Sequence, residues 1–111
     1  MTRYNLVVLS NPVAGQEDEY NRWYSEQHLQ DVLAIPGVIA AQRFRIADES
    51  AGAAHRYLAL YELETDQLAQ VLGELGKRAG TPAMPISAAL DVTGVSMTPF
   101  VAITRRLEAA R

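Results

Sequence analysis

The pattern of apolar and polar positions along the chain predicts four strands and two helices. Short runs rich in aliphatic and β-branched residues are typical of strands, and they occur at residues 4–10, 38–46, 56–63 and 100–104. Apolar residues recur at helical spacing over residues 16–34 and again at Leu68, Leu72 and Leu75. The resulting order, β-α-β-β-α-β, predicts an α+β, ferredoxin-like fold: a four-stranded antiparallel sheet with both helices on one face.

Residues that break regular structure separate these elements. Asn11-Pro12 ends the first predicted strand, and Pro36-Gly37 ends the first helix. Residues 48–54 form a polar loop that favours a hairpin between the second and third strands. Thr65 is expected to cap the second helix, and residues 81–90, which contain two prolines, are expected to form a loop.

Two helices on one face leave the other face of the sheet uncovered. Alternation along the third strand separates Tyr57 and Tyr61 from the leucines between them, and we expect the tyrosines on the uncovered face with Arg43 and Arg45. A second copy of the sheet is the simplest cover, so a homodimer is expected. The two guanidinium groups could bind a carboxylate or a phenolate, or could form an ion-pair network across the interface.

Composition narrows the class of protein. The 111 residues suit a single domain over residues 1–111, and 49% are hydrophobic. A net charge of −3 gives no electrostatic case for nucleic acid or for an anionic membrane surface. The absence of cysteine excludes disulfides and thiolate chemistry. With no signal-peptide pattern and no apolar run of ~18 residues, we expect a cytoplasmic protein that does not cross a membrane.

The first predicted helix carries the residues most suited to chemistry. His28 and Asp31 are three residues apart and share a face, and a carboxylate beside a histidine is a common form of general base. Asp31 could instead pair with Arg43 or Arg45, or accept a backbone N–H near Pro36-Gly37. The same side of this helix gathers Tyr20, Trp23, Tyr24, Gln27, His28, Asp31, Val32 and Ile35.

The candidate catalytic residues are therefore His28, Asp31 and Tyr24, with Tyr24 as a donor to a developing oxyanion. His55, beside a loop, is expected to be exposed. Neither a metal nor another cofactor is expected, because the two histidines and the scattered carboxylates lack metal-ligand spacing. Candidate substrate-binding residues are Tyr20, Trp23, Gln27, Arg43, Tyr57 and Tyr61.

Part of this pattern resembles the dimeric α+β barrel superfamily, most closely its EthD-like branch, named for ethyl tert-butyl ether degradation. The resemblance covers roughly residues 4–63, and its motifs are Asn11-Pro12, Gly15, Glu19-Tyr20-Asn21, Trp23-Tyr24, His28-Leu29, Asp31-Val32-Leu33, Pro36-Gly37 and Arg43-Phe44. It implies a cavity for a small apolar or aromatic compound, between the helices and the sheet or inside the dimer barrel. The superfamily includes cofactor-free monooxygenases, muconolactone-type isomerases, polyketide cyclases, aldoxime dehydratases and chlorite dismutases, so the fold does not fix the reaction.

The leading hypothesis is a cofactor-independent acid/base enzyme, of isomerase, lyase or cyclase type, acting on a small aromatic or unsaturated compound. His28 would be the acid/base, Asp31 its orienting residue or a second acid/base, and Tyr24 the hydrogen-bond donor. One alternative is a cofactor-free monooxygenase of phenolic or quinol-type substrates. Another is a non-catalytic small-ligand-binding accessory protein of a catabolic pathway. Haem chemistry ranks lowest, because only His28 and His55 could supply an axial ligand.

Overall fold

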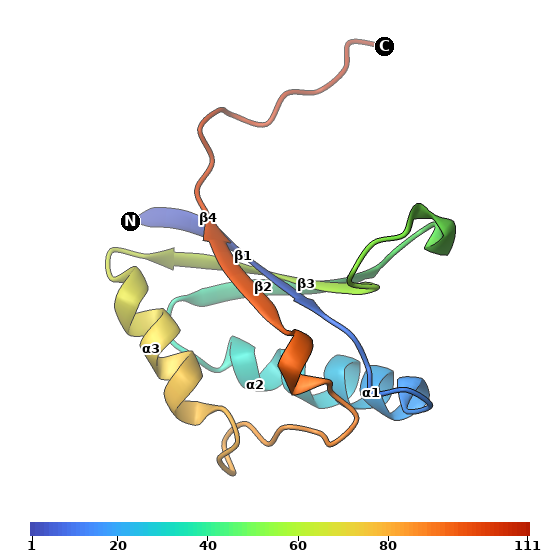
Figure 1. The fold of residues 1–111 in the computed structure, drawn as a ribbon. Coiled ribbons are helices and arrows are strands. Elements are labelled where there is room, and N and C mark those ends of the chain that lie inside the picture. Colours follow the sequence, from blue (N-terminus) through green and yellow to red (C-terminus); the bar gives the residue numbers. More distant parts are fainter.

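The computed structural model describes all 111 residues and has the predicted ferredoxin-like fold (Figure 1). Its four strands form one antiparallel sheet in the order β2-β3-β1-β4. The strands are β1 (Thr2–Ser10), β2 (Val38–Arg45), β3 (Tyr57–Thr65) and β4 (Ser96–Phe100).

The helices cover one face of this sheet (Figure 1). The first is continuous through α1 (Glu17–Trp23), a π-helical turn η1 (Tyr24–His28) and α2 (Leu29–Leu33), close to the predicted 16–34. Three acidic residues in its first turn suit the positive end of the helix dipole. The second helix is α3 (Leu68–Arg78), and short 3₁₀ turns are η2 (Glu49–Ala51) and η3 (Val92–Gly94). None of these helices is long and apolar enough to cross a membrane.

Two predicted boundaries were wrong. The last strand is Ser96–Phe100 and not 100–104, because Met97 and Pro99 pair with Val8 and Leu6 of β1 and extend its apolar face. Pro99 is tolerated because β4 lies at the edge of the sheet. Residues 101–111 then leave the body of the molecule (Figure 1).

Thr65 does not cap the second helix, because it is the last residue of β3 and pairs with Thr2. Its hydroxyl accepts a hydrogen bond from the Gln67 N–H at 2.9 Å, in the turn before the helix begins at Leu68. The residue therefore shapes the connection from strand to helix, which is another common use of threonine in turns.

The expected faces of the third strand were also reversed. Tyr61 is 1% exposed and lies on the face covered by the helices, because it pairs with Leu6, a core residue of β1. Tyr57 lies on the same face, and so does Arg43, which pairs with Ala59. The core on this side comprises residues from both layers, among them Leu6, Val8, Tyr20, Val32, Ile35, Ala59, Tyr61, Leu63 and Val71.

The uncovered face of the sheet carries aliphatic residues instead. Val7 pairs with Leu60, and Leu9 pairs with Leu58, so these four side chains lie together on it. Phe44 on β2 is 44% exposed, and Phe100 on β4 is 54% exposed. The face is thus more apolar than the tyrosine and arginine set predicted from the sequence.

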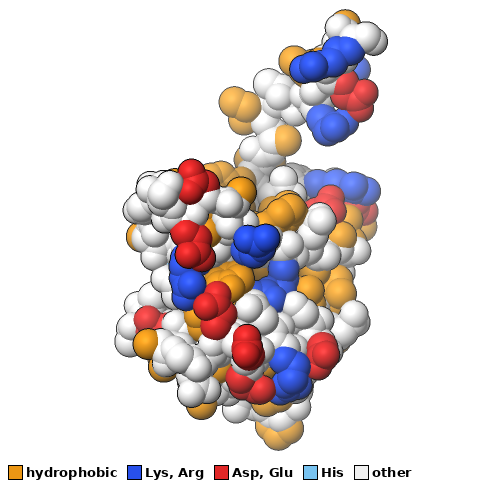
Figure 2. All heavy atoms as spheres, turned by 90° about the vertical axis from the view of Figure 1, so that its right-hand side faces the viewer, with side chains coloured by type: hydrophobic (Ala, Val, Ile, Leu, Met, Phe, Trp, Pro, Cys, Tyr) orange, Lys and Arg blue, Asp and Glu red, His pale blue; other side chains and the backbone are white.

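The outer surface elsewhere is mixed in charge. On the face where α1 begins, acidic and basic side chains are interspersed and neither sign dominates (Figure 2).

Candidate active site

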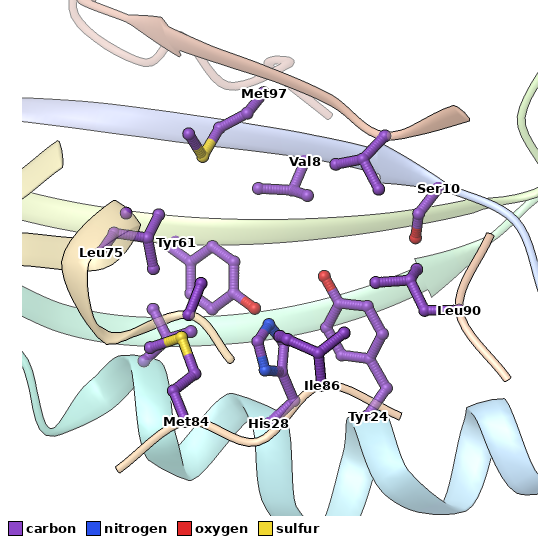
Figure 3. A pocket seen from close by; sticks show the side chains of 14 residues that line it. Val8, Ser10, Tyr24, His28, Tyr61, Leu75, Met84, Ile86, Leu90 and Met97 are labelled. Atoms are coloured by element: carbon purple, nitrogen blue, oxygen red, sulfur yellow. The ribbon is translucent and has the colours of Figure 1, made fainter. Parts of the chain in front are cut away.

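A cavity of about 190 Å³ lies between the sheet, the first helix and the chain that follows α3 (Figure 3). Eleven of its 14 lining residues are hydrophobic, so its wall is mostly apolar. The lining residues are Val8, Ser10, Tyr24, His28, Val32, Tyr61, Leu75, Gly76, Ala79, Met84, Ile86, Leu90, Val95 and Met97.

The π-helical turn brings two of these residues into the cavity. Leu29 N–H donates to Tyr24 O, five residues earlier, and Tyr24 and His28 meet edge to face with ring centroids 4.9 Å apart. Trp23 stacks on the imidazole, at 4.5 Å between centroids, and its own ring meets that of Tyr24 at 5.2 Å. The three rings therefore form one cluster that holds the imidazole in place. Single π-helical turns of this kind are frequent at functional sites.

Two polar atoms in this region have no hydrogen-bond partner in the protein. They are His28 Nδ1 and the Tyr61 hydroxyl, and both are buried. Figure 3 shows the side chains of His28, Tyr24 and Tyr61 directed into the same space. A buried polar group without a partner costs about 1–3 kcal/mol, so a ligand that supplies the missing partners would be favoured here.

Burial also sets the protonation states. It lowers the pKa of His28 to about 4 and raises the pKa of Tyr24 to about 12. The pKa of Tyr61 is raised further, again chiefly by burial. At neutral pH the site thus presents one neutral imidazole and two protonated phenols.

The segment Ala79–Leu90 closes the cavity on the side away from the sheet. Two hydrogen bonds hold this segment in place. Trp23 Nε1 of the first helix donates to Pro85 O at 3.1 Å. Val13 N–H, in the segment before that helix, donates to Ala89 O at 2.7 Å. Met84 is 1% exposed and lines the cavity. The sequence interpretation missed this segment as part of the site, although its apolar residues Met84, Ile86 and Leu90 are the signal that marks it.

The cavity reaches the surface between α3 and β4. On the β4 side, Val95 and Met97 line the cavity although they are 41% and 46% exposed. On the α3 side, Gly76 and Ala79 also line the cavity and are exposed. These four residues form the rim through which a ligand would enter.

Of the predicted site residues, the structure brings His28, Tyr24 and Tyr61 together at the cavity. Tyr20 is fully buried and shares a 2.5 Å hydrogen bond with Ser10. Trp23 supports the His28 ring from behind. Gln27 does not line the cavity.

Asp31 is not placed as the sequence suggested. Its Oδ2 atom is buried without a hydrogen-bond partner, as is His28 Nδ1, and no hydrogen bond joins the two residues. The alternative pairing of Asp31 with Arg43 is not found either, because Arg43 binds Asn21 and Ser25. Sharing a helix face at a spacing of three residues did not bring the imidazole and the carboxylate into contact.

Two further predicted residues lie away from the cavity. The Tyr57 hydroxyl donates to Glu17 and accepts from Asn21 Nδ2 at 3.1 Å, at the start of the first helix. His55 is half-buried and not exposed as expected, because its Nε2 lies 2.6 Å from Gly94 O and ties the loop to η3. No group of three or more histidine, aspartate and glutamate side chains is arranged to hold a metal ion.

No family model and no curated protein matches the chain by sequence. Several solved structures, however, share its fold. An ethyl tert-butyl ether degradation (EthD) family protein from Bacillus halodurans C-125 has a TM-score of 0.63 and 17% identity, over 93% of this chain and 100% of the other. The haem degrader MhuD from Mycobacterium tuberculosis, solved with two haems in its active site, has a TM-score of 0.62 and 18% identity, over 96% and 99%.

A third match is a protein from Shewanella loihica PV-4 described provisionally as a monooxygenase. Its TM-score is 0.58 at 16% identity, over 96% of this chain and 97% of that one. At these identities a likeness carries the fold and leaves the reaction open. The chain thus has the ferredoxin-like fold predicted from its sequence, and an EthD family protein is among the solved structures that share it.

Proposed function

We propose that the protein is an enzyme that carries out acid/base chemistry on a small, single-ring aromatic or unsaturated compound bound in the cavity. The proposal rests on two buried atoms without protein partners, His28 Nδ1 and the Tyr61 hydroxyl, which belong to residues that line an otherwise apolar pocket. A ligand with a ring and one oxygen satisfies both requirements, because the ring fills the apolar space and the oxygen meets the polar atoms.

The size of the cavity limits the ligand. An apolar cavity of about 150 Å³ is known to hold benzene, and the present one measures about 190 Å³. One ring with a small substituent therefore matches the space. A porphyrin has four pyrrole rings and does not fit it, so haem takes no part in the proposed reaction.

The reaction begins with the removal of a proton from the bound compound. With its own proton on Nε2, neutral His28 has a lone pair on Nδ1 and can accept a proton from a carbon or a hydroxyl of the substrate. A histidine whose pKa is lowered to about 4 is a weak base. Here the imidazolium would form beside the anion it creates, and this pairing offsets the cost of burying its charge.

The tyrosines stabilise that anion. Tyr61 and Tyr24 remain protonated at neutral pH and can donate hydrogen bonds to the oxygen on which the negative charge develops. Return of the proton to another carbon gives isomerisation, and departure of a leaving group gives elimination. Asp31 has no part in this scheme, because it neither lines the cavity nor contacts His28 by a hydrogen bond.

The test is hydrogen exchange catalysed by the protein. A panel of single-ring enones, cyclic ketones and phenols is incubated in D₂O, and deuterium incorporation is followed by NMR and mass spectrometry. The wild type should accelerate exchange of at least one compound, and His28→Phe should abolish the acceleration. Binding of such compounds without exchange or turnover would support the non-catalytic accessory role instead.

A second candidate is a cofactor-free monooxygenase of phenols, favoured by the apolar wall of the cavity, which suits O₂ as well as an aromatic ring. Its first step is the same, because deprotonation of a phenol gives the electron-rich phenolate that reacts with O₂. A phenol and O₂ would give a quinone and water, which balances without an external reductant. Oxygen consumption that matches turnover, and loss of turnover under anaerobic conditions, would identify this reaction.

We also propose that the protein forms a homodimer through the uncovered face of the sheet. The exposed Phe44 and Phe100, beside the four aliphatic residues of β1 and β3, support it because a contiguous apolar face is seldom left in water. Light scattering after size-exclusion chromatography should give twice the mass of the chain, and a monomer at micromolar concentration would contradict the proposal.

A further inference from the structure

A second cluster of polar side chains lies outside the cavity, where β2 meets the first helix. Arg43 Nη1 donates to Ser25 Oγ at 2.7 Å and to Asn21 O at 3.4 Å, and Nη2 donates to Asn21 Oδ1 at 2.8 Å. The guanidinium carbon also lies 4.6–5.4 Å from the centres of three aromatic rings, those of Tyr20, Tyr24 and Tyr57. These contacts hold the planar group in one orientation.

The charge of this guanidinium has no acidic partner. No carboxylate lies within the 4.0 Å of an ion pair, because the nearby Glu17 is bound by Arg56 and Tyr57. Arg45, two residues further along β2, is also without an ion-pair partner and is exposed. Both cations border a hollow of about 300 Å³, lined by Asn21, Ser25, Arg43, Phe44, Arg45 and Tyr57.

Arg43 also retains unused donors. A guanidinium has five N–H groups, and the contacts to Asn21 and Ser25 use three of them. The remaining two are the Nε–H and one N–H of Nη2. Nε makes no hydrogen bond and is not among the fully buried polar atoms without partners. Two neighbouring N–H groups on one planar fork match the two oxygens of a carboxylate or a phosphate.

We propose that this hollow is a second ligand site, which binds the oxyanion of a carboxylate or phosphate group through Arg43, with Arg45 adding charge. The site is distinct from the cavity, because the rings of Tyr20 and Tyr24 stand between them: Tyr24 presents its ring face to Arg43 and its hydroxyl to the cavity. It does not depend on the function proposed above, since an anion could bind here whether or not His28 is a catalytic base.

The test uses inorganic phosphate and sodium acetate as separate probes, titrated against the wild type at constant ionic strength. The Nε–H resonance of Arg43, observed by ¹⁵N NMR, should shift in a saturable manner with at least one of them. Saturation by phosphate alone, by acetate alone or by both identifies which oxyanion the site accepts. An Nε–H signal that does not move with either probe would overturn the proposal.

Three variants test whether anion binding depends on the guanidinium group of Arg43 or only on the net positive charge of the protein. Arg43→Gln should weaken binding at least tenfold, and Arg43→Lys, which keeps the charge but loses the fork, should weaken it severalfold. Arg22→Gln is the matched control, because it removes one positive charge from the outer side of the same helix, where Arg22 pairs with Glu19 and Glu26. If Arg22→Gln weakens binding as much as Arg43→Lys, the effect is nonspecific and the site is refuted. If Arg43→Gln does not fold, the comparison of Arg43→Lys with Arg22→Gln is sufficient to test the site, because both variants are scored by the same loss of anion binding.

Discussion

Replacing His28 with phenylalanine should stabilise the fold while it removes function. Burial lowers the pKa of His28 to about 4 in the folded protein, whereas an exposed histidine in the unfolded chain titrates near 6.5. Between these values the unfolded chain binds a proton that the folded protein does not. The free energy of unfolding therefore falls as the pH drops from about 6.5 to about 4, by about 3 kcal/mol in all.

The variant lacks this titration but keeps the shape of the ring. Phenylalanine can keep the contacts with Trp23 and Tyr24, and it removes the unpartnered Nδ1. At pH 7 we expect His28→Phe to be more stable than the wild type by about 1–2 kcal/mol, because a buried orphan acceptor is lost. At pH 4.5 the difference should be larger by about 2–3 kcal/mol, because only the wild type is penalised by protonation of its unfolded state.

The assay is urea unfolding followed by circular dichroism at a series of pH values, with the protein concentration held fixed because a dimer would couple stability to concentration. His55→Gln is the matched control, since His55 is the only other histidine and lies outside the cavity. It should retain the wild-type loss of stability at low pH. Parallel pH profiles for the wild type and His28→Phe would refute the assignment of His28 as a buried, neutral imidazole.

Three other substitutions test separate parts of the structure. Tyr61→Phe removes the other orphan polar atom, so it should leave stability unchanged or raise it by about 1 kcal/mol, while it weakens binding of phenols measured by calorimetry. Gly76→Leu should block the mouth of the cavity without unfolding the protein, because a Cβ at this position meets no atom within 4 Å. The variant should lose ligand binding while its far-UV circular dichroism spectrum stays unchanged. Unchanged binding would place the entrance elsewhere. Gly37→Ala should lower the free energy of unfolding by about 1–3 kcal/mol, because Gly37 has φ +100° and an added Cβ would lie 2.8 Å from Val71 Cγ2. A melting temperature equal to that of the wild type would show that the turn relaxes.

The order of elements and most of their bounds could be predicted from the sequence, because strand and helix periodicity are local properties. The face that each set of residues presents could not. Along β3 the alternation separates tyrosines from leucines, and either set could fill a core. The choice depends on register with β1, which places Tyr61 beside Leu6 and leaves Leu58 and Leu60 on the uncovered face.

The candidate site was predictable in part for a similar reason. His28 and Tyr24 stand out because they share a helix with other aromatic residues, but the π-helical turn that joins them has no marker in the sequence. Met84, Ile86 and Leu90 come from a segment without periodicity, and their place over the cavity depends on distant contacts such as the hydrogen bond from Trp23 to Pro85. Asp31 shows the opposite error, since sequence spacing alone suggested a partnership that the structure does not contain.

The central claim is that the cavity binds a single-ring compound through His28 and Tyr61, and a crystal structure with phenol as the probe tests it most directly. We expect the ring to lie against Val8, Leu75 and Met84, with the phenol oxygen at hydrogen-bond distance, about 2.6–3.2 Å, from His28 Nδ1 or the Tyr61 hydroxyl. A cavity that stays empty at saturating phenol, or phenol bound elsewhere while His28 and Tyr61 remain without partners, would contradict it.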